Sequence, residues 1–218
     1  MNYNIDDYDL FIFDFDGTIM DTEKYHYYSY LKAFKDYDNN IELDINTYFR
    51  FVHNIDRSEY YNFLKDHNIT NLDELYIKKS TNYKFYINNH DSNYIGNFNN
   101  FIQKLKNKNK ELIIVTNSSI ESINVFLNKF SILNSFDKIY TKEDFKTKKP
   151  NPECYLKIQE IYSNKRMIAF EDSYQGIHAL SHAKLIKAIH ISDDDYYFNE
   201  LIKNKYNIER IKNYDCFN

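Results

Sequence analysis

The sequence has 218 residues, which suffices for one or two domains and for a substantial buried core. It contains 22 Tyr and 17 Phe but no Trp, and only three Gly and two Pro. The formal net charge is −4, and acidic and basic residues are mixed along the chain, which argues against a nucleic-acid-binding face.

Neither a membrane span nor a disulfide framework is indicated. No apolar run approaches the roughly 18 residues that a transmembrane helix needs, and the acidic start MNYNIDDYDL lacks the basic flank of a signal peptide. The two cysteines, Cys154 and Cys216, have no motif spacing, which favours reduced thiols. We therefore expect a cytoplasmic protein with neither a membrane partner nor a nucleic-acid partner.

The first predicted element is a strand at 10–13, because the apolar run LFIF is too short for a helix and ends in polar residues. Residues 22–91 instead show helical runs and no convincing strand. These runs lie at 25–34, 58–65 and 72–87. We interpret 22–91 as a small helical domain inserted after the first strand.

Strand-like and helical runs alternate in the rest of the chain. The further strands are expected at 111–116, 138–140, 167–170 and 186–191. Apolar residues at helical spacing predict helices at 95–105 and 120–130, and Asn151-Pro152 opens another. Beyond Asp194 we expect a helix and a short strand. The alternation predicts a doubly wound, Rossmann-like parallel sheet formed by 1–21 and 92–218.

Carboxylates follow two of the predicted strands. Asp14 and Asp16 end the first strand, and Glu171 and Asp172 end the strand at 167–170. Open α/β sheets bind ligands at the carboxyl ends of their strands, and like charges that meet there need a neutralising partner. A hard divalent cation such as Mg²⁺ suits oxygen ligands. Gly17 would permit a tight turn that brings the loop close to this metal.

Two further segments carry groups that suit a phosphoryl group. Thr116, Asn117 and Ser118 offer hydroxyl and amide donors after a strand. Lys149 lies in KTKKPNP, the stretch that holds both prolines, and would supply a positive charge. Taken singly, each segment has an ordinary explanation as a helix cap or a solvated lysine. Together with the carboxylates they suit phosphoryl transfer through an aspartyl-phosphate.

The segments DFDGT, VTNSS, KKPNP and FEDSYQGIHAL, in this order, resemble the four motifs of the haloacid dehalogenase superfamily of phosphatases. The helical insert resembles the cap of its β-phosphoglucomutase-like and phosphoglycolate-phosphatase-like branch, for which a monomer is the default. The resemblance implies that Asp14 is the nucleophile and Asp16 the general acid/base. Thr116 and Asn117 would hold the phosphoryl group, and Lys149 would balance its charge.

The resemblance also implies a Mg²⁺ cofactor and a matching glycine. The metal ligands would be Asp14, the backbone carbonyl of Asp16, Asp172, and Glu171 directly or through water. Gly176 matches the glycine of the turn that enters the next helix.

Some residues of the insert resemble cap positions that contact substrate. His26 matches a histidine near the cap hinge, and Arg57 resembles an arginine that grips a second anionic group in the mutase. A helix-surface histidine and a charge at a helix start are the competing interpretations. Lys78, Lys79 and Asn82 also resemble a cap stretch, but we expect them on a solvated face.

These features predict a Mg²⁺-dependent phosphatase for a small phosphomonoester: a sugar phosphate, phosphoglycolate or a nucleotide-like monophosphate. The alternative is a β-phosphoglucomutase, which His26 and Arg57 favour. Against it, Ser119 and Ile120 stand where the mutase pattern has lysine and asparagine. A dehalogenase lacks the second aspartate, so Asp16 argues against that activity. A non-catalytic relative that binds a phosphorylated ligand is the third alternative, although every chemical position holds a competent residue.

Overall fold

The computed structural model describes residues 4–53, 57–192, 206 and 208–217. The chain divides into two compact units. The first unit combines Met1–Asp21 with Asn93–Asn218, and the second is Thr22–Ser92. We call them the α/β unit and the helical unit and describe each by itself.

The α/β unit is built on a six-stranded parallel sheet, which confirms the predicted fold class. The strand order is β3-β2-β1-β4-β5-β6, with β1 in the centre. The strands are β1 Leu10–Phe13, β2 Glu111–Val115, β3 Lys138–Tyr140, β4 Met167–Glu171, β5 Ile186–Ile191 and β6 Glu209–Ile211. The five strands expected before Asp194 are all present, and β6 is the short strand expected near the end. The helix expected after Asp194 lies outside the described residues.

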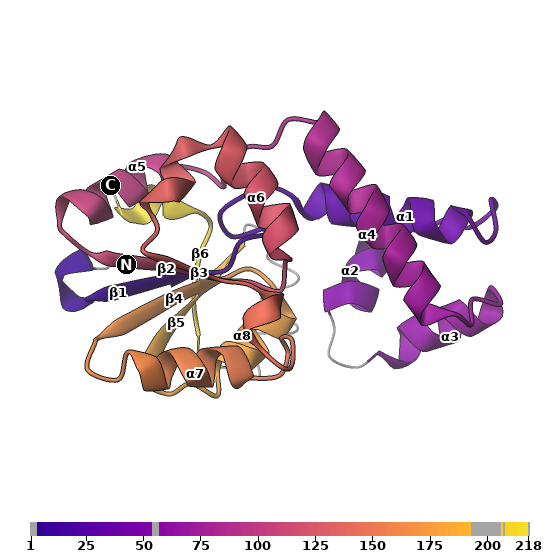
Figure 1. Ribbon diagram of the computed structural model, residues 1–218. Helices are drawn as coiled ribbons and strands as arrows, with labels where there is room; N and C mark the ends of the chain where they lie inside the picture. The colour runs from indigo at the N-terminus through magenta and orange to yellow at the C-terminus, as the bar shows by residue number, and fades with distance from the viewer. Residues whose placement is uncertain (1–3, 54–56, 193–205, 207, 218) are drawn as a thin grey trace. The chain divides into compact units, whose positions relative to one another are not determined.

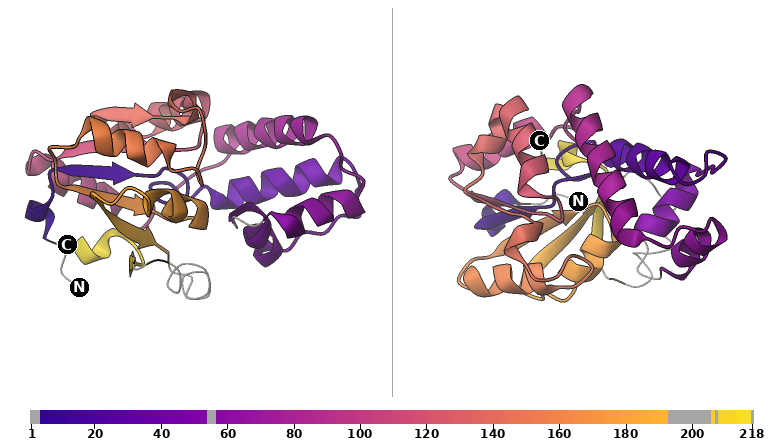
Figure 2. Two further views of the ribbon diagram at one scale, coloured as in Figure 1. Left: turned by 90° about the horizontal axis from the view of Figure 1, so that it is seen from below. Right: turned by 45° about the vertical axis from the view of Figure 1, so that its right-hand side comes forward.

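Helices lie on both sides of this sheet (Figures 1 and 2). They are α5 Phe98–Asn107, α6 Ile120–Lys129, α7 Glu153–Ile161 and α8 Tyr174–Leu180. On one face, Ile12 and Ile113 pack against Tyr155 of α7 within a buried apolar cluster. On the other face, the Phe13 ring stacks on Phe170 with centroids 5.0 Å apart, so the aromatic excess fills the core there. Burial on both faces explains the short, continuous apolar runs of the central strands.

The helical unit contains α1 Glu23–Lys35, α2 Ile45–His53, α3 Ser58–Asp66 and α4 Leu72–Asn89. Its core gathers aromatic and aliphatic side chains from all four helices, including Phe34, Tyr48, Tyr60 and Leu75. Three of these helices match the predicted runs, whereas α2 was not predicted. Asp44 precedes α2, and its side chain accepts hydrogen bonds from the backbone N–H groups of Asn46 and Thr47 at 2.9 and 3.1 Å.

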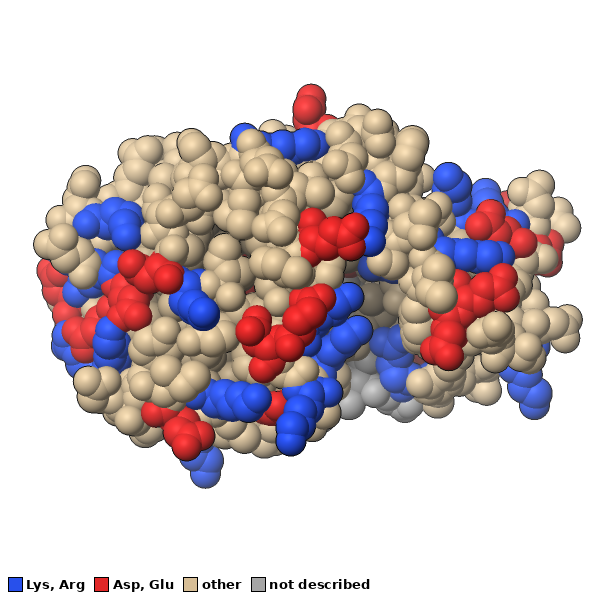
Figure 3. Space-filling view, viewed as in Figure 1, with Lys and Arg blue, Asp and Glu red and all other residues tan. Residues whose placement is uncertain are grey.

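The surface charges follow the mixed pattern of the sequence. On the face shown in Figure 3, lysine and arginine side chains alternate with aspartate and glutamate over the α/β unit. Among the described residues, no helix combines the length and the apolar character that crossing a membrane requires.

Candidate functional site

The carboxylates after β1 and β4 meet because the two strands are parallel neighbours in register. Phe13 pairs with Phe170, so Asp14 comes to lie beside Glu171, and the Asp14 N–H donates to the Phe170 carbonyl at 3.0 Å. One oxygen each from Asp14, Glu171 and Asp172 lies within 4.8 Å of the others. The structure thus brings together three of the four predicted metal-ligand residues through their side chains.

Two glycines make room for this cluster. A Cβ atom at Gly17, whose φ is +73°, would overlap the Asp172 carboxylate, and one at Gly176 would overlap the Glu171 carboxylate. The Oε2 atom of Glu171 is buried and accepts no hydrogen bond from the described residues. A buried carboxylate oxygen with no donor is costly unless a cation meets it. The oxygen-only ligand set and this orphaned atom fit a hard divalent cation.

Lys149 contacts two carboxylates of the cluster, Asp14 and Glu171, and is almost fully buried. Its Nζ donates to Asp14 Oδ1 at 2.6 Å, to Glu171 Oε1 at 2.5 Å and to the Val115 carbonyl at 2.7 Å. These three contacts use all three ammonium protons. Burial alone would lower the pKa of Lys149, but the Asp14 and Glu171 carboxylates raise it well above its usual range, so the side chain stays cationic.

The Asp14 carboxyl experiences opposing influences on its pKa. Burial raises the pKa of Asp14 to about 8; Lys149 acts against this rise, whereas the negative charge of Glu171 adds to it. A divalent cation at the cluster would favour the ionised form. The nucleophilic form of Asp14 therefore depends on the positive charges around it.

Asn117 holds the loop that carries Lys149. Its Nδ2 donates to the Lys149 carbonyl at 3.1 Å, and its Oδ1 accepts from the Lys149 N–H at 3.0 Å. The carboxamide that the sequence assigns to phosphate binding therefore binds protein backbone in this structure. Thr116 is buried beside it, and its hydroxyl oxygen accepts from the Ser118 N–H at 3.0 Å.

Two hydroxyl groups at the site contact carboxylates: that of Ser118, which the sequence offers as a phosphate donor, and that of Thr18, which was not singled out from the sequence. The Ser118 hydroxyl donates to Asp16 Oδ2, and the Thr18 hydroxyl donates to Asp172 Oδ1 at 3.2 Å. Thr18 lies inside the motif DFDGT, so that motif contained the signal for it. Each hydroxyl fixes the orientation of a carboxylate whose chemistry depends on where its oxygens point.

Glu153, on the first turn of α7, fastens the segment just before Lys149. It accepts hydrogen bonds from the N–H groups of Lys146 and Thr147 at 3.0 and 2.8 Å, and from the Thr147 hydroxyl at 2.6 Å. The Thr147 hydroxyl first, and then the Lys146 N–H, lower the pKa of Glu153 from 4.5 to about 2.

A Glu153→Ala variant is therefore expected to be less stable than wild type at neutral pH. A carboxylate with a lowered folded-state pKa stabilises the fold above its ordinary value of 4.5, and this contribution disappears as the pH falls from 4.5 towards 2. Melting temperatures measured across this range should converge as the pH falls. Glu160→Ala, an exposed position on the same helix, is the control. A constant difference between Glu153→Ala and wild type at every pH would contradict this assignment.

The helical unit places His26 and Arg57 in different surroundings. His26 Nδ1 lies 2.6 Å from Lys79 Nζ, and the His26 ring stacks on Tyr83 with centroids 4.0 Å apart. Arg57 Nη1 donates to the Val52 carbonyl at 3.1 Å. Arg57 is therefore tied to its own unit by at least one hydrogen bond.

Of the solvated face expected at Lys78, Lys79 and Asn82, the prediction is wrong for Asn82, whereas both lysines are partly exposed. Asn82 is buried, and its Nδ2 lies 3.4 Å from the Ser29 carbonyl, to which it donates. Lys79 is half-buried against His26, and Lys78 is half-buried beside Glu74. The α1–α4 pairing turns part of this stretch inward, which the mixed polar sequence of α4 does not reveal.

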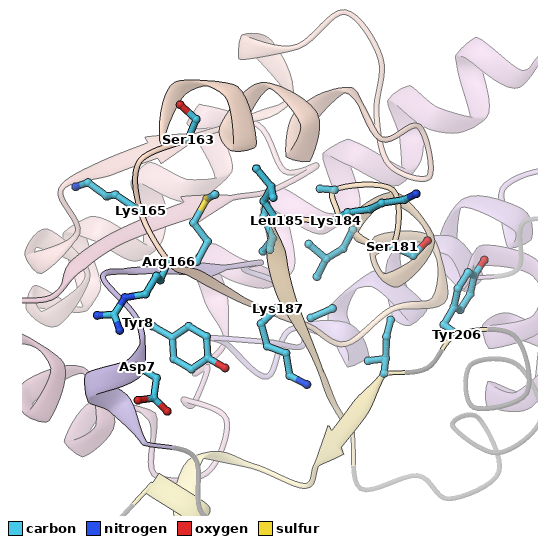
Figure 4. Close-up of a pocket in the computed structure, with 16 residues that line it drawn as sticks. Asp7, Tyr8, Ser163, Lys165, Arg166, Ser181, Lys184, Leu185, Lys187 and Tyr206 are labelled. Carbon is cyan, nitrogen blue, oxygen red and sulfur yellow. The ribbon is translucent and has the colours of Figure 1, made fainter.

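An open groove of about 900 Å³ lies at the amino ends of β1, β4 and β5, away from the carboxylate cluster (Figure 4). Tyr8 and several cationic side chains line it. Three of these cations each pair with a carboxylate. The pairs are Lys165–Glu111, Arg166–Asp9 and Lys187–Glu209. Since their charges are already compensated, the groove is a weaker candidate for a phosphate site than the carboxylate cluster.

Comparison with known families identifies the family of the chain. The family model for haloacid dehalogenase-like hydrolases matches residues 11–191, which include all four motifs and the helical unit. A search of curated protein sequences found no match.

Solved structures resemble the chain over nearly its full length. A mutant of CbbY from Rhodobacter sphaeroides, in complex with xylulose-(1,5)bisphosphate, is 17% identical with a TM-score of 0.74, covering 95% of each chain. A HAD hydrolase, family IA, variant 3, from Entamoeba histolytica is 23% identical with a TM-score of 0.75, covering 94% of this chain and 93% of the other. A predicted phosphoglycolate phosphatase from Haemophilus somnus is 19% identical with a TM-score of 0.71, covering 94% of each chain. At these identities the likeness shows the fold.

Proposed function

Because the chain belongs to the haloacid dehalogenase-like hydrolases, we propose that it is a Mg²⁺-dependent phosphatase that hydrolyses a small phosphomonoester through an aspartyl-phosphate. One observation carries this proposal: Asp14 is buried 2.6 Å from the Lys149 ammonium, within 4.8 Å of carboxylate oxygens of Glu171 and Asp172. A carboxylate held among cationic and metal-binding groups can approach a phosphate dianion, which an isolated carboxylate would repel.

In the first proposed step, a carboxylate oxygen of Asp14 attacks phosphorus while the bond from phosphorus to the ester oxygen breaks. Asp16, oriented by the Ser118 hydroxyl, gives its proton to the departing oxygen. In the second step, Asp16 takes a proton from the water that attacks the phosphorus of the aspartyl-phosphate. Phosphate leaves, and both carboxyl groups return to their starting states.

The proposed Mg²⁺ ligands are Asp14, the backbone carbonyl of Asp16, Asp172, and Glu171 directly or through water. When bound, the ion supplies positive charge that offsets the repulsion between the Asp14 carboxylate and the phosphate. The Thr18 hydroxyl orients Asp172 for this role. Lys149 contributes one further positive charge, which Asp14 and Glu171 share within the protein.

We assign binding of the phosphoryl oxygens to the Thr116 hydroxyl and to the Asn117 segment. Asn117 is an exposed residue whose carboxamide is engaged with the Lys149 backbone, so its own backbone N–H is the better phosphate donor. Lys149 uses all its protons within the protein, so a phosphoryl oxygen would have to share or replace one of these contacts. We assign selection of the leaving group to the helical unit as a cap, with His26 and Arg57 as its candidate substrate contacts.

Mg²⁺ dependence is the first expected result. The purified protein should release phosphate from p-nitrophenyl phosphate with Mg²⁺, lose this activity in EDTA and regain it when Mg²⁺ is restored, because the carboxylate cluster needs a divalent cation to accept an anion. Full turnover in EDTA would contradict the metal assignment. No phosphate release from a broad panel of phosphorylated metabolites would instead favour the non-catalytic ligand-binding alternative.

A β-phosphoglucomutase is the second candidate, because His26 and Arg57 resemble cap positions of that enzyme, and His26 Nδ1 lies 2.6 Å from Lys79 Nζ in the helical unit. The same panel separates the two activities. Conversion of β-glucose-1-phosphate to glucose-6-phosphate with a bisphosphate primer would establish the mutase, whereas release of phosphate without isomer formation would establish the phosphatase.

A further inference from the structure

Tyr155 contacts the carboxylate cluster through Glu171, although it belongs to none of the four motifs. It lies on α7 and is fully buried within the apolar cluster under the sheet. Its hydroxyl donates to Glu171 Oε1, the same oxygen that accepts from Lys149 Nζ. The Lys149 ammonium also lies 5.0 Å from the centroid of the Tyr155 ring.

Packing alone does not require the Tyr155 hydroxyl. Ile12, Ile113 and Ile158 belong to the same cluster, so a phenylalanine ring would fill the same space. Burial, reinforced by the charge of Glu171, raises the pKa of Tyr155 well above its usual range. The only hydrogen bond of this hydroxyl among the described residues goes to Glu171.

The distribution of donors between the two carboxylates is unequal. Glu171 Oε1 accepts from Tyr155 and Lys149, while Asp14 Oδ1 accepts from Lys149 alone of these two. The single ammonium group of Lys149 donates hydrogen bonds to both carboxylates. Without the hydroxyl, the buried Glu171 oxygen would have only Lys149 as its donor, and a buried carboxylate with fewer donors competes more strongly for a cation.

We propose that Tyr155 is a positioning residue. Its hydroxyl donates one of the hydrogen bonds that the buried Glu171 carboxylate accepts, so that the Lys149 ammonium stays shared between Glu171 and Asp14. Its effect on turnover rests on the proposed function, because Asp14 must be ionised and correctly placed to attack phosphorus. Its effect on the Lys149 ammonium does not rest on any activity, so the two can be tested separately.

The direct test is NMR of the side-chain ammonium groups in full-length protein labelled with ¹⁵N-lysine, recorded without substrate or added metal. The Lys149 signal is identified by its loss in Lys149→Met. Tyr155→Phe should shift this signal, because the ammonium moves towards Glu171. Tyr162→Phe, which removes a hydroxyl from the end of the same helix, should leave it in place. An unchanged Lys149 signal in Tyr155→Phe would overturn the proposal.

The kinetic test uses p-nitrophenyl phosphate with Mg²⁺. Tyr155→Phe should lower kcat about tenfold with little change in KM, as expected for the loss of one hydrogen bond to a charged group. The same substitution in a Glu171→Gln background should cost much less, because the hydroxyl acts through Glu171. Equal costs in both backgrounds would overturn the route through Glu171. An inactive wild type would contradict the proposed function, while the NMR result would still decide the role of Tyr155.

Discussion

Replacing Asp14 with Asn is expected to abolish turnover, with a loss in kcat of about 10⁴-fold or more, because the amide is no nucleophile towards phosphorus. The fold should persist. Asn has nearly the same shape, and its neutral side chain removes one of the two carboxylates that share Lys149, so Lys149 and Glu171 remain as a balanced pair. Thermal melting should therefore match or exceed that of wild type while phosphate release disappears.

Asp215→Asn, at an exposed position of the same unit, is the matched control and should keep full activity. Covalent labelling makes the test specific. Wild-type protein quenched during turnover should carry phosphate on the peptide that contains Asp14, and the Asp14→Asn protein should carry none. Phosphate release by the variant at more than a small fraction of the wild-type rate, with the substitution verified by mass, would remove Asp14 from the role of nucleophile.

The sequence predicts the sheet well because its strands are buried on both faces. The runs LFIF, ELIIV and MIAF are apolar nearly throughout, and the structure buries nearly every one of these side chains in the centre of the sheet. The carboxylate cluster is predictable for a related reason. Asp14 and Glu171 each stand at the end of such a run, and parallel neighbours place their carboxyl ends at one edge.

The contacts of Asn117 and Tyr155 are not readable from the sequence. Asn117 reaches the Lys149 backbone across 32 residues, and Tyr155 reaches Glu171 across 16, so both contacts depend on how α7 and its loop pack against the sheet. With 22 tyrosines in the chain, nothing in the sequence marks the hydroxyl of Tyr155 as one that touches the site. Tertiary packing alone selects it.

Helix α2 differs from these contacts, because the sequence does carry its signal. Asp44 is a good N-cap residue, and Ile45, Tyr48, Phe49 and Val52 follow at helical spacing. The abundance of aromatic residues throughout 22–91 hid this periodicity. Composition bias therefore weakens pattern recognition even where the local physical signal is complete.

The second large effect is expected for Lys149→Met, which keeps the length of the side chain but removes its charge. Asp14 and Glu171 would then stay buried side by side without the ammonium that now lies 2.6 and 2.5 Å from them. Breaking a buried ion pair from one side costs about 3–5 kcal/mol of folding stability. The fall in kcat should reach about 10³-fold, since Asp14 loses the charge that favours its ionised form.

Chemical denaturation and p-nitrophenyl phosphate hydrolysis measure these two losses, with Lys148→Met as the control, because Lys148 is the exposed neighbour in the same loop.

Two conditions should rescue the stability of Lys149→Met more than that of wild type. Mg²⁺ should do so by supplying the missing positive charge to the carboxylates. Lowering the pH from alkaline values should do so because burial already raises the pKa of Asp14 to about 8 in wild type, and losing Lys149 raises it further. A carboxyl whose folded-state pKa is raised is stabilised by protonation, so the deficit should shrink as the pH falls from the still higher pKa of Asp14 in the variant to about 8, and it should stay constant below that pH. Equal stability of the Lys149→Met and Lys148→Met proteins at neutral pH would mean that the two carboxylates need no internal cation, and the charge balance assigned to this site would be wrong.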